Sequence, residues 1–480
     1  MLKSFFKNNL IYSLGNILTM GISIFLLPIY TKYLSPNEFG IIDLFMVIGT
    51  FVNLTIALEI SQGLARYYQE AKNNIEKKHY TSSAFWFTIL IYLLFFVFSF
   101  TFRDILSSWL LGNENEKKIF ILALLAIVTN GIFIFTQNQL KWQMKAENSV
   151  KASLVYFTVL ASVTIYLLVV QGFRVESIFI GQISGNIIAS LVAIYFARKS
   201  YELNFSITKF KEMISYSSPL VLSSIGVIVG LYIDRIAIRD LLGFEELGIY
   251  GVAFRFTAIA GLVIIGFQHS LTPLIFKNYK KKKTPLEISK IFNVFVILAL
   301  LVVAMTILFS KEIVILFTAK IFYNASNLIT VLIIAVFFSN MHIFSPGLPI
   351  AKKTKLIALI ALFGAILNTI LNYTLIPMLG LSGAAYATLI SSITTFIIYL
   401  FFSNKYYPLP YQFRKQIISL TIVLISTYSV VSIFDEVNLI SIFIKTIYLL
   451  FVFVLTIYLL MEKKYLHQIR TNIIGKKISN

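Results

Sequence analysis

The sequence predicts an all-α protein that crosses a membrane about fourteen times. The chain of 480 residues is 58% hydrophobic and only 13% charged, which lies outside the range of ordinary soluble domains. Long apolar stretches recur along it, each close to the roughly 20 residues that a helix needs to cross a ~30 Å hydrocarbon layer. A transmembrane barrel is disfavoured, because its strands alternate apolar and polar residues, whereas residues 83–102 and 439–461 are apolar on every side.

The apolar stretches define the expected spans, which follow one another with short loops. The first is expected to be retained as a span, because it is too long for a signal peptide and lacks a small-residue cleavage site. In order, the expected spans are residues 9–30, 41–64, 81–102, 119–139, 152–170, 177–197, 214–233, 248–272, 291–309, 328–345, 356–376, 380–402, 417–434 and 439–461.

Lys and Arg are segregated between alternate loops. Of the 41 basic residues, 30 lie at the two chain ends or in the gaps on the same side as them, and nine lie in the opposite gaps. Cytoplasmic loops carry an excess of Lys and Arg, so this pattern predicts a polytopic membrane protein with both termini in the cytoplasm. The net charge of +20 is spread over many loops rather than gathered on one soluble face, which argues against nucleic-acid binding.

The residue types needed for covalent chemistry are missing or scattered. The chain has no cysteine, and its four histidines show no metal-ligand spacing, so neither a thiolate nor a metal site is expected. It has no Gly-rich phosphate-binding loop of the P-loop type. The longest outer gaps, near 103–118 and 310–327, are too short for a catalytic domain. We therefore expect a protein that is not an enzyme and has no cofactor.

An internal repeat organises the helices. Residues 34–41 (LSPNEFGI) align with residues 242–249 (LGFEELGI) at an offset of 208, with four identities in eight positions. Six helices separate the copies, so both face the same way and form parallel repeats related by an axis along the membrane normal. This predicts a six-helix lobe at 1–205, a second at 206–403, and helices 13 and 14 with a cytoplasmic tail at 404–480.

Three segments resemble one family. They run from Tyr12 to Gly40 (YSLGN…LP…YLSPNEFG), from Asp234 to Tyr250 (DR…LG…LGIY) and from Leu371 to Thr388 (LNYTLIPMLGLSGAAYAT). In order and spacing they are similar to bacterial polysaccharide and O-antigen exporters of the Wzx type. That family belongs to a superfamily, called MOP, that also contains the multidrug (MATE) exporters and the lipid II flippase.

The resemblance implies both a fold and a function. The fold would be two six-helix lobes that expose a central site alternately to either side. The substrate would be an undecaprenyl-diphosphate-linked oligosaccharide, carried from the cytoplasmic to the outer leaflet for O-antigen, capsule or a related polymer. The implied partners are this lipid-linked substrate, membrane lipid, and polysaccharide polymerase or assembly proteins.

Cations within or beside the spans are the candidates for substrate binding. Arg255 is the first, because a charge inside a span costs about 2.5–3.5 kcal/mol on insertion scales and a guanidinium matches phosphate oxygens; the alternative is an ion pair with Glu59 or Asp43. Arg235 and Arg239 share a helix face, which suggests a cationic patch at the outer opening, with interfacial capping as the alternative. Asn16 belongs to a polar stripe on the first span, which would line a hydrated lumen or bond to a neighbouring helix.

Carboxylates in the spans are the candidates for ion coupling. They are Glu59, Asp43 and Asp234, and without a nucleotide site an H⁺ or Na⁺ gradient is the expected energy source. Pairing with Arg66 is the alternative for Glu59. Asp43 and Glu59 lie about 160° apart around one helix, so we expect at least one to be a structural partner. Adjacent helical residues do not face each other, so Asp234 and Arg235 are not expected to pair.

Other transporter classes fit the sequence less well. Many MATE-type multidrug exporters carry an acidic residue in the first helix, and residues 9–30 contain none. A lipid II flippase is expected to have arginines on the cavity face of its early helices, and the first span has none. Lys445, in the last span, is expected to snorkel outward.

Overall fold

The computed structural model describes residues 26–112 and 116–461, apart from several side chains of α9 and α11, and all the regular structure in these ranges is helical. Eleven helical segments in the described ranges are long and apolar enough to cross a membrane. The all-α polytopic membrane fold predicted from the sequence is confirmed. The chain divides into two compact units, Met1–Gly251 and Val252–Asn480.

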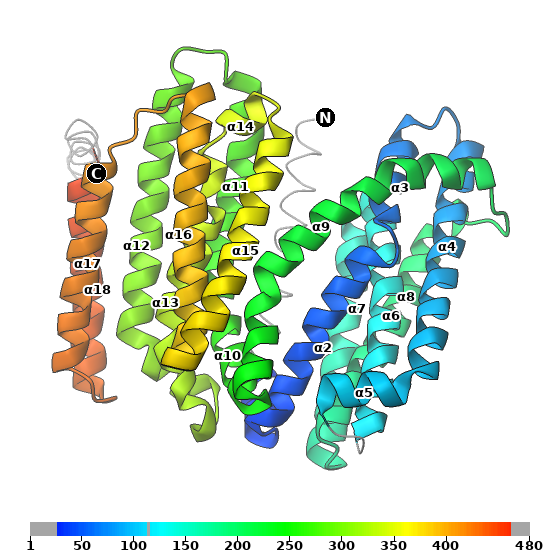
Figure 1. The fold of residues 1–480 in the computed structure, drawn as a ribbon, viewed down its shortest axis with the longest axis horizontal. Coiled ribbons are helices and arrows are strands. Elements are labelled where there is room, and N and C mark those ends of the chain that lie inside the picture. Colours follow the sequence, from blue (N-terminus) through cyan, green and yellow to red (C-terminus); the bar gives the residue numbers. More distant parts are fainter. Residues whose placement is uncertain (1–25, 113–115, 462–480) are drawn as a thin grey trace, which may run out of the picture. The chain divides into compact units, whose positions relative to one another are not determined.

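The first unit holds the helices drawn from blue to green in Figure 1. They are α2 (Pro36–Thr55), α3 (Ile60–Glu70), α4 (Asn74–Thr101), α5 (Arg103–Leu111), α6 (Lys117–Trp142), α7 (Ala146–Ile165), α8 (Val175–Ala197), α9 (Ile207–Leu242) and the first part of α10 (Phe244–Phe256).

The second unit begins within α10 and holds the helices drawn from green to red (Figure 1). They are α11 (Ala258–Asn278), α12 (Thr284–Phe317), α13 (Ser326–Asn340), the short α14 (Gly347–Ile350), α15 (Thr354–Leu379), α16 (Leu381–Tyr406), α17 (Phe413–Ile433) and α18 (Leu439–Leu460).

The expected spans map onto these helices, but two of them are interrupted. In the span 248–272, α10 ends at Phe256 and α11 begins at Ala258. Most of the first span, 9–30, lies outside the described residues, and so does Asn16; the helix that ends the described part of it runs to residue 33. The second span, 41–64, is not one helix, because α2 ends at Thr55 and α3 begins at Ile60. Leu58 and Glu59 between them adopt positive φ angles of 49° and 50°, a left-handed conformation that no α-helix continues through.

Small residues let the helices of the first unit approach closely. Ala189, Ala193 and Ala197 of α8 are fully buried in a cluster with Phe133 and Leu140 of α6. Without a hydrophobic driving force between helices in lipid, such van der Waals contact is what holds membrane helices together. The predicted helix bundle is therefore stabilised by closeness of fit rather than by exclusion of water.

The C-terminal helix pair is attached to α12 by buried polar contacts. Lys445 of α18 is 1% exposed and pairs with Glu312 of α12, so the expectation that it snorkels outward is wrong. An internal carboxylate offers the ammonium group a better partner than a distant membrane surface does. Near the other end of the pair, the Gln416 amide of α17 donates to Asn293 of α12 over 2.8 Å.

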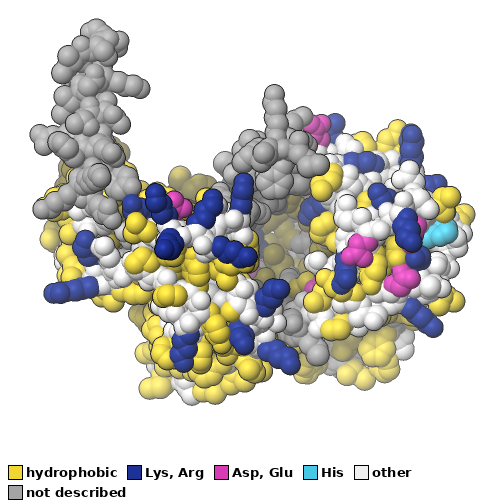
Figure 2. Space-filling model, turned by 90° about the horizontal axis from the view of Figure 1, so that it is seen from above, with side chains coloured by type: hydrophobic (Ala, Val, Ile, Leu, Met, Phe, Trp, Pro, Cys, Tyr) yellow, Lys and Arg dark blue, Asp and Glu magenta, His cyan; other side chains and the backbone are white. Residues whose placement is uncertain are grey.

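Basic side chains gather on one end of the helices. Figure 2 shows this end face, with Lys and Arg in dark blue far outnumbering the acidic side chains among the described residues. The loop between α11 and α12, which carries Lys280–Lys283, lies at this end. It is the end that the charge pattern assigns to the cytoplasm.

Candidate functional site

The helices α2 and α10 cross with their backbones in contact. A Cβ added to Gly40 would lie 2.0 Å from the carbonyl oxygen of Phe244, and one added to Gly248 would lie 1.9 Å from the carbonyl oxygen of Pro36. Such distances leave no space for any side chain. Glycine is therefore required at both positions by close approach of two main chains.

The crossing is reciprocal under the sequence repeat. Pro36 and Phe244 are 208 residues apart, and so are Gly40 and Gly248. The glycine of each copy therefore packs against the equivalent first residue of the other copy's helix. A self-complementary contact of this kind is what a two-fold axis produces. The alignment of residues 34–41 with 242–249 thus corresponds to a pseudo-symmetric contact in space.

One turn deeper, the symmetry is broken by charge. The residue equivalent to Asp43 is Gly251, and a Cβ on Gly251 would lie 2.9 Å from the Asp43 carboxyl carbon. The missing side chain in one copy thus makes space for the carboxylate of the other. A polar site is therefore built on one side only.

Asp43 belongs to a cluster of four buried side chains, which we call the charge cluster: Asp43 of α2, Asp234 and Arg235 of α9, and Tyr250 of α10. The Arg235 guanidinium lies 3.0 Å from Asp43 Oδ2 and 3.0 Å from Asp234 Oδ1. The Tyr250 hydroxyl donates to the other oxygen of Asp234. Arg235 is 3% exposed, and both carboxylates are buried as well.

The electrostatics of the charge cluster follow from the number of charges that it contains. Two carboxylates and one guanidinium leave a formal charge of −1 away from water, and hydrogen bonds from Tyr250 and Arg235 disperse it. Charges in such an environment persist only when they are paired and hydrogen-bonded. The cluster fastens α9 to α2 at about 10 Å from the Pro36 end of α2.

Two expectations about these residues are wrong. Asp234 and Arg235 do contact each other, because the long arginine side chain turns back along the helix to reach its neighbour. Arg235 and Arg239 do not form a cationic patch, because Arg235 is neutralised inside the charge cluster and Arg239 pairs with Asp240 at 2.5 Å. The Arg239 guanidinium also lies 5.8 Å from the ring centroid of Trp109 on α5.

Glu59 lies at the break between α2 and α3. Its carboxylate accepts a hydrogen bond of 2.6 Å from Ser224 of α9, and the preceding carbonyl, of Leu58, accepts one of 2.8 Å from Ser217. Its expected alternative partner, Arg66, pairs instead with Glu70 at 3.2 Å. An interrupted membrane helix exposes polar backbone, and transporters place binding sites at such breaks.

The helix after the break has a polar face that we did not predict. Gln62, Arg66 and Gln69 of α3 are exposed, while Gly63 and Leu64 are buried. The Arg66 guanidinium lies 4.5 Å from the ring centroid of Tyr216 on α9. The signal in the sequence is the spacing of residues 62, 66 and 69, which share one face of a helix. A single apolar span over 41–64 hides this face, because it places residue 62 inside the membrane.

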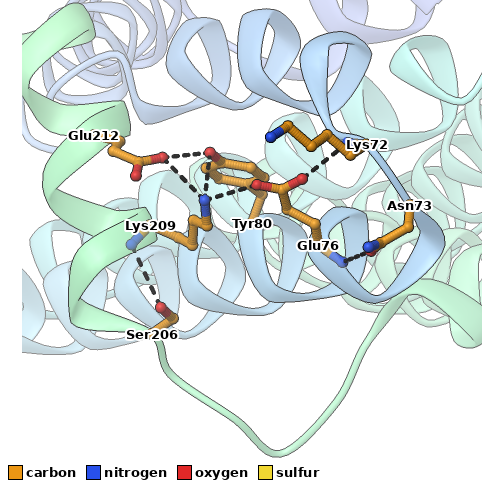
Figure 3. Close-up of polar contacts among 7 residues, drawn as sticks. All are labelled: Lys72, Asn73, Glu76, Tyr80, Ser206, Lys209 and Glu212. Atoms are coloured by element: carbon orange, nitrogen blue, oxygen red, sulfur yellow. Dashed lines mark hydrogen bonds and ion pairs between the residues drawn. The ribbon is translucent and has the colours of Figure 1, made fainter.

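A second polar cluster fastens the other end of α9, as Figure 3 shows. Lys209 lies between α9 and α4, with its ammonium nitrogen 2.7 Å from Glu76 and 3.1 Å from the Tyr80 hydroxyl. Glu212 accepts from the same hydroxyl. The hydrogen bond to Glu76 raises the pKa of Lys209. Contacts at both ends thus place α9 in the first unit.

The predicted residue Arg255 lies in the last turn of α10. It lies on α10 beyond Gly251, in the second unit, and is partly buried. The predicted carboxylates Asp43, Asp234 and Glu59 all lie in the first unit. Asp234 belongs to α9, and Asp43 and Glu59 each contact a side chain of α9. The structure thus brings together Asp43, Asp234 and Arg235, whereas Glu59 is bonded to Ser224 and Arg239 is paired with Asp240.

Comparisons with known proteins identify the group to which the fold belongs. Residues 29–276 match the family described as polysaccharide biosynthesis protein, and residues 219–374 match the MatE family. The chain is 21% identical to the probable low-salt glycan biosynthesis flippase of Haloferax volcanii over 84% of each chain. It is 23% identical to a capsular polysaccharide biosynthesis protein of Staphylococcus aureus over 82% of this chain and 97% of the relative.

A solved structure shows the same architecture. The lipid II flippase in its inward-closed conformation superposes with a TM-score of 0.74 at 16% identity, covering 93% of this chain and 98% of the other. This similarity concerns the fold. The match over more than half of the sequence establishes that the chain, a multi-pass membrane protein by its many apolar helices, belongs to the polysaccharide biosynthesis protein family.

Proposed function

We propose that the protein carries an undecaprenyl-diphosphate-linked oligosaccharide across the bacterial cytoplasmic membrane by alternating access, with both termini in the cytoplasm. The observation that carries the proposal is the reciprocal crossing of α2 and α10 above the charge cluster. Relatives named as a glycan biosynthesis flippase and a capsular polysaccharide biosynthesis protein support the substrate class. Products would pass to polymerase or assembly proteins at the outer surface.

In this mechanism the α2–α10 crossing acts as the outer closure. Pro36 and Phe244 begin the two helices at the predicted outer side, and contact of their main chains leaves no passage between them. The charge cluster stabilises the closure from within, because separating Arg235 from its carboxylates would leave unpaired charges in an apolar environment. Opening to the outside would therefore require those charges to be compensated.

Ion coupling would supply that compensation. The charge cluster has a formal charge of −1, so a proton or a Na⁺ ion bound at Asp43 or Asp234 would neutralise it and weaken the hold on Arg235. Glu59, at the break beside Ser224, is the second position at which a bound proton would change contacts between α3 and α9. No cofactor takes part in this mechanism.

Cations outside the charge cluster would recognise the diphosphate. Arg255, on the helix that belongs partly to each unit, is the first candidate, since its guanidinium can bind two phosphate oxygens at once. Arg239 and Arg66, each held beside an aromatic ring, are further candidates. The polar face of α3 would form hydrogen bonds with the sugar hydroxyls during transport.

The proposal is tested in proteoliposomes that contain the full-length chain and a fluorescent lipid-linked oligosaccharide, with leaflet exposure read by a lectin. We expect translocation that depends on the protein, and its loss in Arg255→Ala with membrane insertion and abundance unchanged. Lys281→Gln, in an exposed loop, is the matched control. Translocation by Arg255→Ala at the rate of the unsubstituted protein would remove this residue from the site.

The energy source is tested in the same vesicles. We expect the initial rate to change when a proton or a sodium gradient is imposed, and the response to be reduced in Glu59→Gln and Asp43→Asn. Rates that are the same with and without both gradients would reject ion coupling while leaving the substrate assignment intact.

A further inference from the structure

A cavity lies between the C-terminal helix pair and the rest of the second unit. It has a volume of about 390 Å³ and is lined by side chains of α12, α13, α16 and α17, with Phe292, Ala299, Ile397 and Leu420 among them. Nearly all of its wall is hydrocarbon. Its size falls in the range of ligand-binding cavities in proteins, roughly 300–1,000 Å³.

The cavity opens sideways at one end of the helices. Ile397 of α16 and Ile417 of α17 line it and are 57% and 61% exposed, so the opening faces the position of membrane lipid. Along α17 it extends from Phe413 to Leu420, about 10 Å. Along α12 it extends from Phe292 to Val303, about 16 Å, which is close to the roughly 15 Å depth of one leaflet. Its lining on α16 and α17 lies toward the end of α16 and the start of α17, which the charge pattern assigns to the cytoplasmic side.

One polar group inside the cavity lacks a partner. Gln416 is 6% exposed and lines the cavity. Its amide nitrogen donates to Asn293, but among the described residues nothing donates to its buried Oε1. A buried acceptor without a donor costs about 1–3 kcal/mol, so this position indicates an occupant that brings a hydrogen-bond donor along with apolar bulk.

Cations lie at the ends of the two helices that form one side of the cavity. Arg414 and Lys415, in the first turn of α17, are exposed and stand between the lining residues Phe413 and Gln416. Lys405, in the last turn of α16, is also exposed, with its ammonium group over the Phe401 ring. Basic pockets between membrane helices on the cytoplasmic side bind anionic lipid headgroups, with about 1 kcal/mol of attraction for each Lys or Arg.

We propose that this cavity is a binding site for an anionic glycerophospholipid of the inner leaflet, with one acyl chain inside and the phosphate at Arg414 and Lys415. A hydroxyl of the headgroup or glycerol region, or a water that it holds, would donate to Gln416. A methylene group is about as large as a water molecule, which takes about 30 Å³, so the cavity accommodates on the order of a dozen carbons. That matches most of one acyl chain and only a fraction of an undecaprenyl chain.

The test is native mass spectrometry of the full-length protein in detergent, with dioleoyl phosphatidylglycerol or dioleoyl phosphatidylcholine added. We expect one lipid adduct that survives activation, with the anionic lipid bound about tenfold more tightly than the zwitterionic one. Equal binding of the two lipids would overturn the proposal, and so would displacement of the adduct by undecaprenyl phosphate, which would assign the cavity to the substrate tail.

Two kinds of variant locate the adduct. Arg414→Gln with Lys415→Gln should weaken binding of the anionic lipid about tenfold, whereas Lys281→Gln with Lys282→Gln, exposed at the same end face, should not. Ala299→Phe should fill the cavity and abolish the adduct, whereas Ala361→Phe, on the exposed side of α15, should retain it. If each pair behaves alike, the lipid binds elsewhere and the proposal is wrong.

Discussion

Arg235 is a buried cation that joins two helices of the first unit. It joins α9 to α2 through Asp43 and holds Asp234 in the same helix, with all three side chains buried. A buried ion pair adds little net stability, but removing one of its partners destabilises the protein strongly. Removing a partner from a buried pair costs about 3–5 kcal/mol, because the other charge is left uncompensated.

Substitutions in the charge cluster should therefore rank in a fixed order. Arg235→Gln leaves two adjacent carboxylates and should reduce thermal stability most, by about 3–5 kcal/mol. Asp43→Asn leaves a one-to-one pair of Arg235 with Asp234 and should cost less. The order is measured by thermal unfolding in detergent, with Arg239→Gln, whose partner Asp240 is exposed, as the control. If Asp43→Asn were the more damaging change, the charge count would be wrong.

Restoring the charge balance should rescue stability. Asp43→Asn combined with Asp234→Asn and Arg235→Gln removes every charge from the cluster, so no uncompensated group remains. We expect this triple variant to be more stable than Arg235→Gln alone, since the energies of residues in one network are not additive. A triple variant that is less stable than Arg235→Gln would show that the side chains matter through packing rather than charge.

At the scale of the helices, the crossing of α2 and α10 predicts paired effects. Gly40→Ala and Gly248→Ala each place a methyl group against the backbone of the other helix. Overpacking of this kind costs about 1–3 kcal/mol, and pseudo-symmetry makes the two costs similar. Gly226→Ala on α9 is the control, because a Cβ there meets nothing within 4 Å.

Because the chain has no native cysteine, the effect of the glycine substitutions on the outer closure can be measured by labelling a single introduced cysteine. A single cysteine introduced near the Pro36 end of α2 should react faster with a membrane-impermeant maleimide in both glycine variants, because the outer closure is weakened. A change in only one variant would mean that the crossing does not act as a symmetric pair.

The contact of Lys209 with α4 should be small and insensitive to pH near neutrality. Lys209 is partly exposed, so Lys209→Gln should cost about 1 kcal/mol or less. Its pKa is raised by the hydrogen bond to Glu76, so the contribution is fully present below the unfolded value of about 10.4 and is lost only at higher pH. Lys211→Gln is the control. The difference in unfolding free energy between Lys209→Gln and Lys211→Gln, measured between about pH 6 and 9, should stay constant.

At the scale of the molecule, the two copies of the repeat are alike in their glycine contact but differ in the charged residues beside it. The glycine pair is equivalent in the two copies, but Asp43 faces Gly251, and the positions equivalent to Asp234 and Arg235 are Leu26 and Leu27. A duplicated scaffold thus provides a symmetric contact between α2 and α10, beside one charge cluster to which the first copy contributes Asp43 and the second contributes Asp234 and Arg235.

Much of this was predictable from the chain alone. The apolar stretches determined where helices form, because a bilayer leaves backbone groups no partner other than one another. The alignment of residues 34–41 with 242–249 marked the two segments that contact each other through Gly40 and Gly248. The division into lobes at 205 and 403 stays a prediction. The unit boundary at Gly251 is a separate observation: α9 is fastened to α2 and α4 by Arg235 and Lys209.

What the sequence determined by itself was the class of protein, its helices and the reason why charge is scarce within them, since each of these depends on local hydrophobicity and length. What only the tertiary structure decided was which charges meet. Arg235 lies 192 residues from Asp43, Lys445 lies 133 from Glu312, and the break at Glu59 is stabilised from another helix. A buried charge is stable only beside its partner, and no local pattern specifies which distant segment supplies one.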